Sequence, residues 1–242
     1  MKAVKKILLV ILIIFAAVFL FKDLLARLII SSAVKAMTGY ELKIKSINIA
    51  LLKSQVGVGG LLLHNPQGFP DKLMVDMPKI FVYYDLGAFL KGKAHLRELA
   101  INLKEFTVER NAAGKLNLDN LKPFLASKGK PVEFKIDVLN LAIGKIVFKD
   151  YSAGQVPSVR EFKVNLNERF ENIDNPEKLI KLIVVRSLAS TNIAGLTGFD
   201  LNSWKKEVSG TIKQATSAVS QTIQQTTGGL EKDIKSILQF GQ

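Results

Sequence analysis

The sequence predicts a mainly β protein with helices at both ends: an N-terminal transmembrane helix, an antiparallel β-sheet and C-terminal amphipathic helices. Fifteen consecutive apolar residues lie near the start, at Ile7–Phe21. From Tyr40 onward apolar residues recur at every second position, as they do in strands, and a helical period returns only near Asn175. We therefore divide the chain into an anchor with a juxtamembrane helix (1–39), a β domain (40–170) and a helical C-terminal region (171–242).

The charge of the chain is basic but dispersed. It holds 34 basic and 21 acidic residues among 242, a net charge of +13. The sequence shows no dense Lys/Arg block and no basic helix with interleaved aromatic residues, so we expect no nucleic-acid partner and instead an attraction to anionic lipid headgroups. Cysteine is absent, which excludes disulfides, a thiol nucleophile and a thiolate metal site.

The apolar run is flanked by charge on both sides. Three lysines precede it, and Lys22 and Asp23 follow it. Fifteen residues fall short of the roughly 20 that span a bilayer core, but Ala3, Val4 and snorkelling lysines extend the segment. The residues expected to anchor the chain in the membrane are Ile7, Leu8, Ile11, Ile14, Phe15, Phe19 and Phe21.

A cleaved signal peptide is the alternative interpretation of this segment. Its only small pair, Ala16-Ala17, lies inside the apolar run, so we favour an uncleaved signal anchor. The leading lysines then keep the N-terminus in the cytoplasm and place everything after Lys22 outside. From Leu24 to Met37 apolar residues follow one helical stripe, which predicts a helix at the membrane surface that ends near Gly39.

Eight strands are predicted in the β domain, separated by turns rich in Gly, Pro, Asn and Ser. Short spacings without intervening helices favour an antiparallel meander. The strands are Glu41–Leu51, Gln55–His64, Met74–Tyr84, Lys93–Leu103, Glu105–Arg110, Val132–Leu141, Lys145–Tyr151 and Val159–Asn167.

The faces of the second predicted strand are both apolar. Val56, Val58 and Leu62 alternate there with Leu61 and Leu63, and the third strand shows a similar pattern. A sheet with one solvated face would be polar on that side. We therefore expect an apolar cover over the second face, which can be a helix, another sheet or a lipid.

Two helical stretches follow the strands. Asn175-Pro176-Glu177 is typical of a helix start, with an N-cap, a proline at the first position and an acid in the first turn. The tail from Leu201 to Phe240 has short apolar heptads that break at Gly228-Gly229. We expect this tail to self-associate, contact a protein partner or lie on the sheet edge, rather than form a long coiled coil.

The sequence offers no residues for catalysis or for a metal. Its two histidines, His64 and His95, each lie in a predicted strand without a second ligand at metal spacing. Gly57-Val-Gly59-Gly60 continues into a strand rather than a helix, unlike a phosphate-binding loop. We expect a protein that is not an enzyme and has no cofactor; a hydrolase using His64 or His95 is the least favoured class.

Several short motifs follow the anchor in a recognisable order. They are Thr38-Gly39, Val58–Phe69, Met77–Tyr84, Leu86–Gly92, Leu99–Leu103, Phe106–Arg110, Gly114–Leu118 and Ile143–Tyr151. Together, over about residues 1–170, they resemble the N-terminal part of AsmA-family envelope proteins, which belong to the repeating-β-groove, bridge-like lipid transfer group.

The resemblance implies a curved antiparallel sheet, a half-barrel or groove, whose concave apolar side holds the acyl chains of membrane lipids. It also implies a periplasmic body held to the bacterial inner membrane by a single span. The candidate lipid-contacting residues are Val56, Val58, Leu62, Ile80, Val82, Tyr84, Leu99, Ile101, Phe134, Ile136, Ile146 and Phe148.

Two functions remain open from the sequence. The first is lipid binding or transfer in the cell envelope without catalysis. The second is a structural or interaction protein of the envelope without bound lipid, whose sheet is covered by its own helix near Leu179–Leu188 and whose tail contacts a partner. Eight strands at roughly 4.8 Å each stack to about 38 Å, which is short for a single-copy bridge between two membranes.

Overall fold

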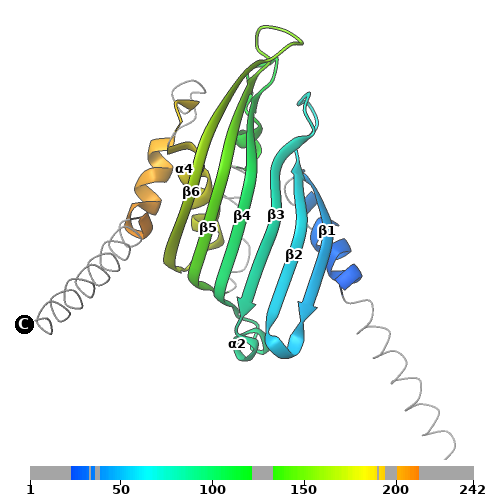
Figure 1. The fold of residues 1–242 in the computed structure, drawn as a ribbon, viewed down its shortest axis with the longest axis vertical. Helices are drawn as coiled ribbons and strands as arrows, with labels where there is room; N and C mark the ends of the chain where they lie inside the picture. Colours follow the sequence, from blue (N-terminus) through cyan, green and yellow to red (C-terminus); the bar gives the residue numbers. More distant parts are fainter. Residues whose placement is uncertain are drawn as a thin grey trace, which may run out of the picture.

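The computed structural model describes residues 23–32, 34–35, 39–121, 133–189, 191–193 and 201–212. Six strands form one open sheet in the order β1-β2-β3-β4-β5-β6 (Figure 1). The elements are β1 (Glu41–Ala50), η1 (Leu51–Lys53), β2 (Gln55–His64), β3 (Leu73–Tyr84), α2 (Leu86–Leu90), β4 (Ala94–Arg110), η2 (Asn117–Asn120), β5 (Phe134–Asp150), β6 (Ser158–Ile173) and α4 (Pro176–Ala189). Residues 23–32, 34–35 and 201–212 are also helical.

The predicted transmembrane segment, Ile7–Phe21, lies outside the described residues. Within the part of the chain that the structure describes, no helix combines the length and the apolar character needed to cross a membrane.

The sheet is mixed, so the prediction of a wholly antiparallel meander is wrong. β4 and β5 run parallel with Ala94 beside Phe134 and Arg110 beside Asp150, while the other four neighbouring pairs are antiparallel. The chain returns from the end of β4 to the start of β5 through residues 111–133, which include η2. A connection of this length can cross the sheet, whereas a short hairpin cannot.

The number of strands is six rather than the predicted eight. β4 and β5 are each 17 residues long. Each continues through a point at which the sequence analysis predicted the end of one strand and the start of the next. The other strands match closely: β2 has the predicted ends, β1 and β3 differ by one residue, and β6 continues six residues further, to Ile173.

At one level of the sheet, each of the six strands has a residue that is not paired with a residue of the neighbouring strand. We call this row of residues the crease: Lys45, Gly60, Pro78, Lys104, Gly144 and Asn165. Gly60 and Asn165 have positive φ angles of 62° and 46°, and proline has no N–H to donate. A Cβ on Gly144 would lie only 2.6 Å from the carbonyl oxygen of Lys104. Glycine is therefore required where β5 passes β4.

At the crease, the alternation of side chains between the two faces shifts by one residue, which we call the phase change. In β4 the buried apolar positions change from the odd-numbered Leu99, Ile101 and Leu103 to the even-numbered Phe106 and Val108, and all five belong to one hydrophobic core. β5 changes phase at the same level. The apolar residues that the sequence assigned to two faces therefore lie largely on one face, and they do not require a cover on both sides.

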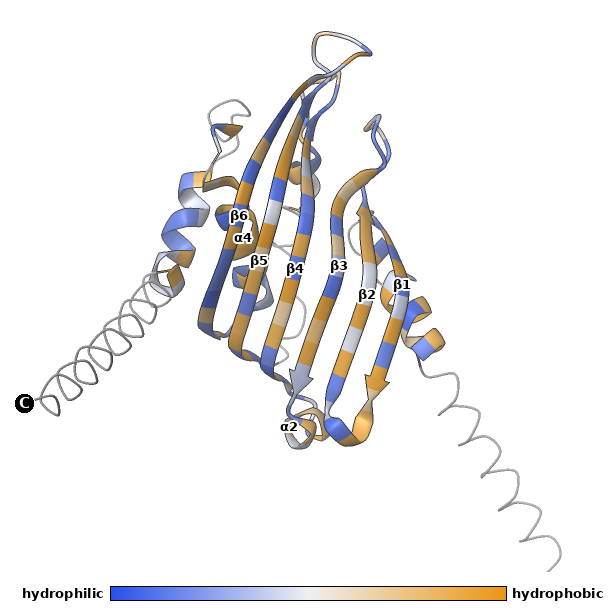
Figure 2. Cartoon of the chain, in the orientation of Figure 1, coloured by the Kyte–Doolittle hydropathy of each residue, from blue (hydrophilic) through white to orange (hydrophobic). Residues whose placement is uncertain are grey.

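The other face of the sheet is more polar. It carries Lys79, Asn102, Asn140 and Asn167 together with Phe81, around a shallow depression. β6, at the sheet edge, is mostly hydrophilic along its length (Figure 2), and its charges discourage pairing with a further strand.

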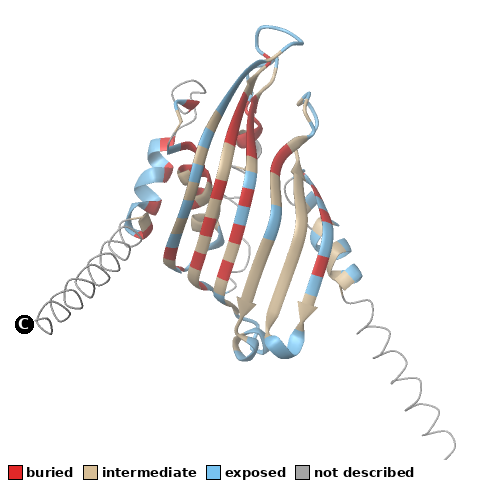
Figure 3. Cartoon of the chain, in the orientation of Figure 1, coloured by how far each residue is buried: buried red, intermediate tan, exposed pale blue. Residues whose placement is uncertain are grey.

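Two helices cover the apolar face from opposite edges (Figure 1). Residues 23–35 lie along β1: the Arg27 guanidinium donates to the Lys45 carbonyl at 3.0 Å, and the Asp23 carboxylate accepts from the Ile49 N–H at 3.1 Å. α4 lies against β5 and β6, with Leu182 and Leu188 in the core. Burial is greatest on β4 and β5, between these helices (Figure 3).

The N-terminus of α4 confirms the predicted cap, because the Glu177 N–H donates to Asn175 Oδ1 at 2.7 Å. α4 then contacts the helical residues 201–212. The Lys181 ammonium pairs with Glu177 at 2.6 Å and with Glu207, and lies 5.9 Å from the centre of the Trp204 ring. The described beginning of the tail therefore packs on α4, and the remainder of the tail lies outside the described residues.

We expect Gly144→Ala to lower the free energy of unfolding by about 1–3 kcal/mol, because the added methyl group cannot avoid the backbone of β4. The matched control is Gly57→Ala in β2, whose Cβ would meet nothing within 4 Å; it should stay within about 0.5 kcal/mol of wild type. Urea unfolding of the full chain in detergent, followed through its one tryptophan, measures both values. Equal stability of the two variants would contradict the role assigned to the crease.

Candidate functional site

An apolar cavity of about 530 Å³ lies on the covered face, between the helical residues 23–35 and α4. β2, β3 and β4 form its floor on the side of the crease that leads to the loop 65–72. Its wall consists of Ile29, Ile30, Val34, Tyr40, Leu63, Met74, Val75, Met77, Leu103, Phe106, Leu121, Ile180, Ile183 and Val184.

Among the described residues that form the wall, none has a charged side chain, and the only side-chain hydroxyl is that of Tyr40. That hydroxyl donates to the main-chain oxygen of Asn117 at 2.6 Å. Burial, together with the nearby charge of Asp119, raises the pKa of Tyr40 above its ordinary value, so the hydroxyl stays protonated. The cavity therefore suits an apolar chain and offers no anchor for a charged group.

The wall is open toward the N-terminal helix. On the floor, Met74, Leu103 and Phe106 are at most 3 % exposed, whereas Ile29 and Ile30 at the rim are 66 % and 43 % exposed. Exposed apolar side chains of this helix therefore border the cavity, while its floor is buried.

The twelve residues that the sequence proposed as lipid contacts lie outside the cavity wall. Leu99, Ile101, Ile136, Ile146 and Phe148 are buried in the core. The other residues have partly exposed side chains: Ile80, Val82 and Phe134 pack against that core, and Val56 and Val58 pack against the neighbouring cluster around Leu42, Ile44 and Ile47.

Two of the twelve occupy different surroundings. Leu62 is paired with Lys43 and Asp76 and lies on the face opposite to Leu61 and Leu63. Because the phase change at Gly60 intervenes, it also lies opposite to Val56 and Val58, which share the cluster of Leu61 and Leu63. Tyr84 packs on Phe89 of α2, with ring centres 6.0 Å apart.

The sequence prediction omitted the wall residues Leu63 and Met77 because it continued one alternation through Gly60 and Pro78, and it proposed no lipid contact in the predicted strand that holds Phe106. The glycine pair at 59–60 and Pro78 are the signals that could have indicated a change of phase.

His64 directly follows the wall residue Leu63 at the end of β2, whereas His95 lies near the start of β4, beside Lys135. His64 Nδ1 is 3.4 Å from Glu41, and His95 Nε2 is 2.8 Å from Asp137. Among the described residues, no group of three or more metal-binding side chains comes together.

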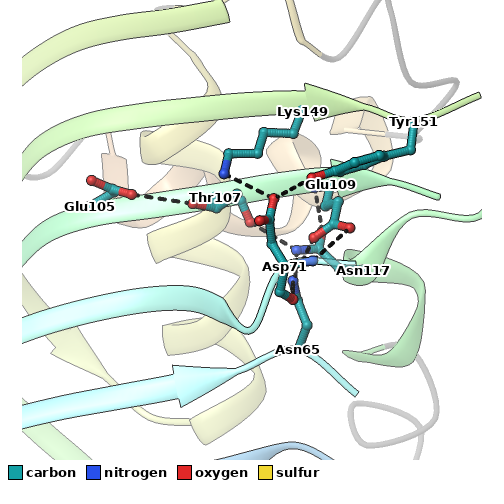
Figure 4. Close-up of polar contacts among 8 residues, drawn as sticks. All are labelled: Asn65, Asp71, Glu105, Thr107, Glu109, Asn117, Lys149 and Tyr151. Atoms are coloured by element: carbon teal, nitrogen blue, oxygen red, sulfur yellow. Dashed lines mark hydrogen bonds and ion pairs between the residues drawn. The ribbon is translucent and has the colours of Figure 1, made fainter. Parts of the chain in front are cut away.

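A buried polar cluster stabilises the end of the sheet next to the cavity (Figure 4). Its centre is Asn117, whose side chain accepts from the Glu109 N–H at 3.0 Å and donates to the Thr107 oxygen at 2.8 Å and to Asn65 Oδ1 at 2.9 Å. The cluster therefore joins the end of β2 to β4 and to the crossover that follows it.

Glu109 is the fully buried carboxylate of this cluster. It accepts from Asn65 Nδ2 at 2.8 Å and from the Asp71 N–H at 3.4 Å. Asp71 in turn accepts from the Tyr151 hydroxyl at 3.0 Å and pairs with Lys149 at 2.9 Å. Burial, opposed in part by the Asp71 N–H, raises the pKa of Glu109 to about 7. No sequence pattern indicates this group, because a lone acid at the end of a strand has the pattern of a solvated residue.

The raised pKa of Glu109 predicts a loss of stability as the pH rises from 4.5 to about 7. The unfolded chain releases this proton near pH 4.5 and the folded chain keeps it until about pH 7, so unfolding becomes easier across that window and then stays constant. We expect Glu109→Gln to remove about 1–3 kcal/mol of this change. Glu161→Gln, at an exposed site on β6, should leave it in place. Urea unfolding at several pH values tests both, and an unchanged slope in Glu109→Gln would contradict the prediction.

Comparison of the chain with known protein families, with curated proteins and with solved structures finds no match. The likeness to the AsmA family therefore depends on the order of the sequence motifs alone.

Proposed function

We propose that this protein is a membrane-anchored, extracytoplasmic protein of the cell envelope that binds the acyl chain of a lipid in the apolar cavity. The observation that carries this proposal is a wall whose fourteen described residues include no charged side chain, with Ile29 and Ile30 exposed at its rim. Binding requires no catalysis, and we propose no enzymatic step.

The size of the cavity supports a ligand of this class. A volume of about 530 Å³ lies within the roughly 300–1,000 Å³ of sites that hold small molecules. Each methylene group that leaves water contributes about 0.8 kcal/mol. Because the wall has no partner for a charged group, the lipid headgroup would stay outside, near the rim.

The dimensions of the sheet favour local binding or transfer over a bridge between membranes. Six strands at about 4.8 Å spacing extend across roughly 24 Å. α4 also covers part of the apolar face over β5 and β6, so the described apolar face is not an open groove along the whole sheet.

α4 also favours the second candidate, a structural or interaction protein of the envelope without lipid. Leu182, Val185 and Leu188 pack on the sheet and are at most 1 % exposed, so the protein itself supplies much of the cover that its strands require. In that case the C-terminal tail would contact a protein partner or a second copy.

Lipid that co-purifies with the full chain distinguishes the two candidates. We expect native mass spectrometry of detergent-extracted protein to detect bound phospholipid. Met77→Trp, which places a larger ring in the cavity, should lower the bound fraction by about fivefold or more, a cost of roughly 1 kcal/mol in binding.

The matched control is Val159→Trp, at a half-exposed site on β6 outside the cavity wall, which should keep the wild-type lipid content. Repeated isolation of the wild type without lipid would favour the structural candidate. Lipid bound equally to wild type and to Met77→Trp would place the lipid elsewhere on the protein.

A further inference from the structure

Five large apolar side chains are exposed at one end of the sheet, on two neighbouring turns. Leu51 and Leu52 belong to η1, and Leu86, Phe89 and Leu90 belong to α2. Leu52 is fully exposed, and Leu90 and Phe89 are 77 % and 65 % exposed. We call residues 51–53 and 86–93 the tip. Apolar side chains exposed together in this way mark a contact site.

The two turns of the tip are fixed in place. The Tyr84 N–H donates to the Ser54 carbonyl at 3.0 Å, which holds the turns side by side at the lower end of the sheet (Figure 1). The Asp85 carboxylate caps α2 by accepting from the Ala88 N–H at 2.9 Å, and it also accepts from Arg97 at 2.8 Å. The exposed leucines and phenylalanine therefore project from an ordered backbone.

The charge of the tip is positive. Lys53, Lys91 and Lys93 lie in it, and its eleven residues include no acid. The nearby acids are already paired, Asp85 with Arg97 and Glu133 with Lys93 at 2.7 Å. Exposed leucine and phenylalanine beside lysine suit the interface of an anionic bilayer. A protein interface is a poorer match, since lysine is depleted there.

The N-terminal helix enters the body at the same end as the tip. The carboxylate of Asp23 accepts from the Ile49 N–H at 3.1 Å, two residues before Leu51. In the sequence, Asp23 directly follows Lys22 and the apolar segment Ile7–Phe21. A chain that leaves a membrane at Lys22 would therefore reach the body beside the tip.

We propose that the tip inserts into the surface of an anionic bilayer, the same membrane that receives the segment Ile7–Phe21. This proposal depends on the membrane placement in the proposed function, but not on lipid in the cavity. The apolar side chains enter the boundary between headgroups and acyl chains, about 5–10 Å deep, and the lysines contact the phosphates. With two attachment points, the anchor and the tip, the orientation of the sheet relative to the membrane is fixed.

Quenching by brominated lipids tests the insertion directly. The chain has no cysteine, so Leu52→Cys and Phe89→Cys each carry one fluorophore in the full chain, reconstituted into vesicles of phosphatidylcholine and phosphatidylglycerol. The control is Val156→Cys, 87 % exposed at the far end of the sheet. We expect about threefold stronger quenching at 52 and 89 than at 156, because only the tip enters the acyl boundary.

Two double variants test the contribution of charge to the insertion of the tip. Lys53→Gln with Lys91→Gln should weaken quenching at position 52, as should vesicles of phosphatidylcholine alone. Lys72→Gln with Lys115→Gln removes two exposed charges at the opposite end of the sheet and should have no effect.

The outcomes separate this proposal from the proposed function. Equal, weak quenching at 52, 89 and 156 in chain that floats with the vesicles overturns the tip proposal alone, and assigns the tip to a protein partner. Chain that does not float with vesicles overturns both the anchor and the tip. Neither result affects the test of lipid binding in the cavity, which native mass spectrometry measures separately.

Discussion

The phase change at the crease is the constraint on which the rest of the structure depends. Side chains of a strand alternate between two faces, so a 17-residue strand with unbroken alternation would present half of this sequence's apolar residues to the wrong side. Gly144, set against the carbonyl of Lys104, and the positive φ of Gly60 allow the strands to pass this point together. One continuous apolar face results, and the cavity lies on it beside the crease.

The polar cluster and the cavity are connected to each other at the end of the sheet that carries the loop 65–72. The main-chain oxygen of Asn117 accepts from Tyr40, whose ring forms part of the cavity wall, while the Asn117 side chain holds Glu109, Thr107 and Asn65. A buried polar network costs free energy unless its members are satisfied. Here the satisfied bonds fix η2, and thereby the position of Leu121 at the cavity.

The sequence predicted the elements that depend on local pattern. Alternation and turn residues placed both ends of β2, and Asn175-Pro176 predicted the start of α4. The parallel pairing of β4 and β5 was missed because the strand pattern contains no sign of direction, and the crossover of residues 111–133 lacks a clear helical period. The cavity residues differ from the predicted lipid contacts for a different reason: alternation carried through Gly60 selects Leu62, whereas Leu63 lines the cavity.

The helical residues 23–32 connect the region of the tip with the cavity. Asp23 lies beside the tip, and Ile29 and Ile30 lie at the cavity rim. Between these points it exposes Leu24, Leu25 and Leu28, which are 42 %, 45 % and 56 % exposed. An acyl chain crossing open water would lose about 0.8 kcal/mol per methylene, and an apolar path along the helix reduces that cost. Because the path starts and ends on one body, it supports the proposed capture of lipid from an anchoring membrane over delivery across a wide gap.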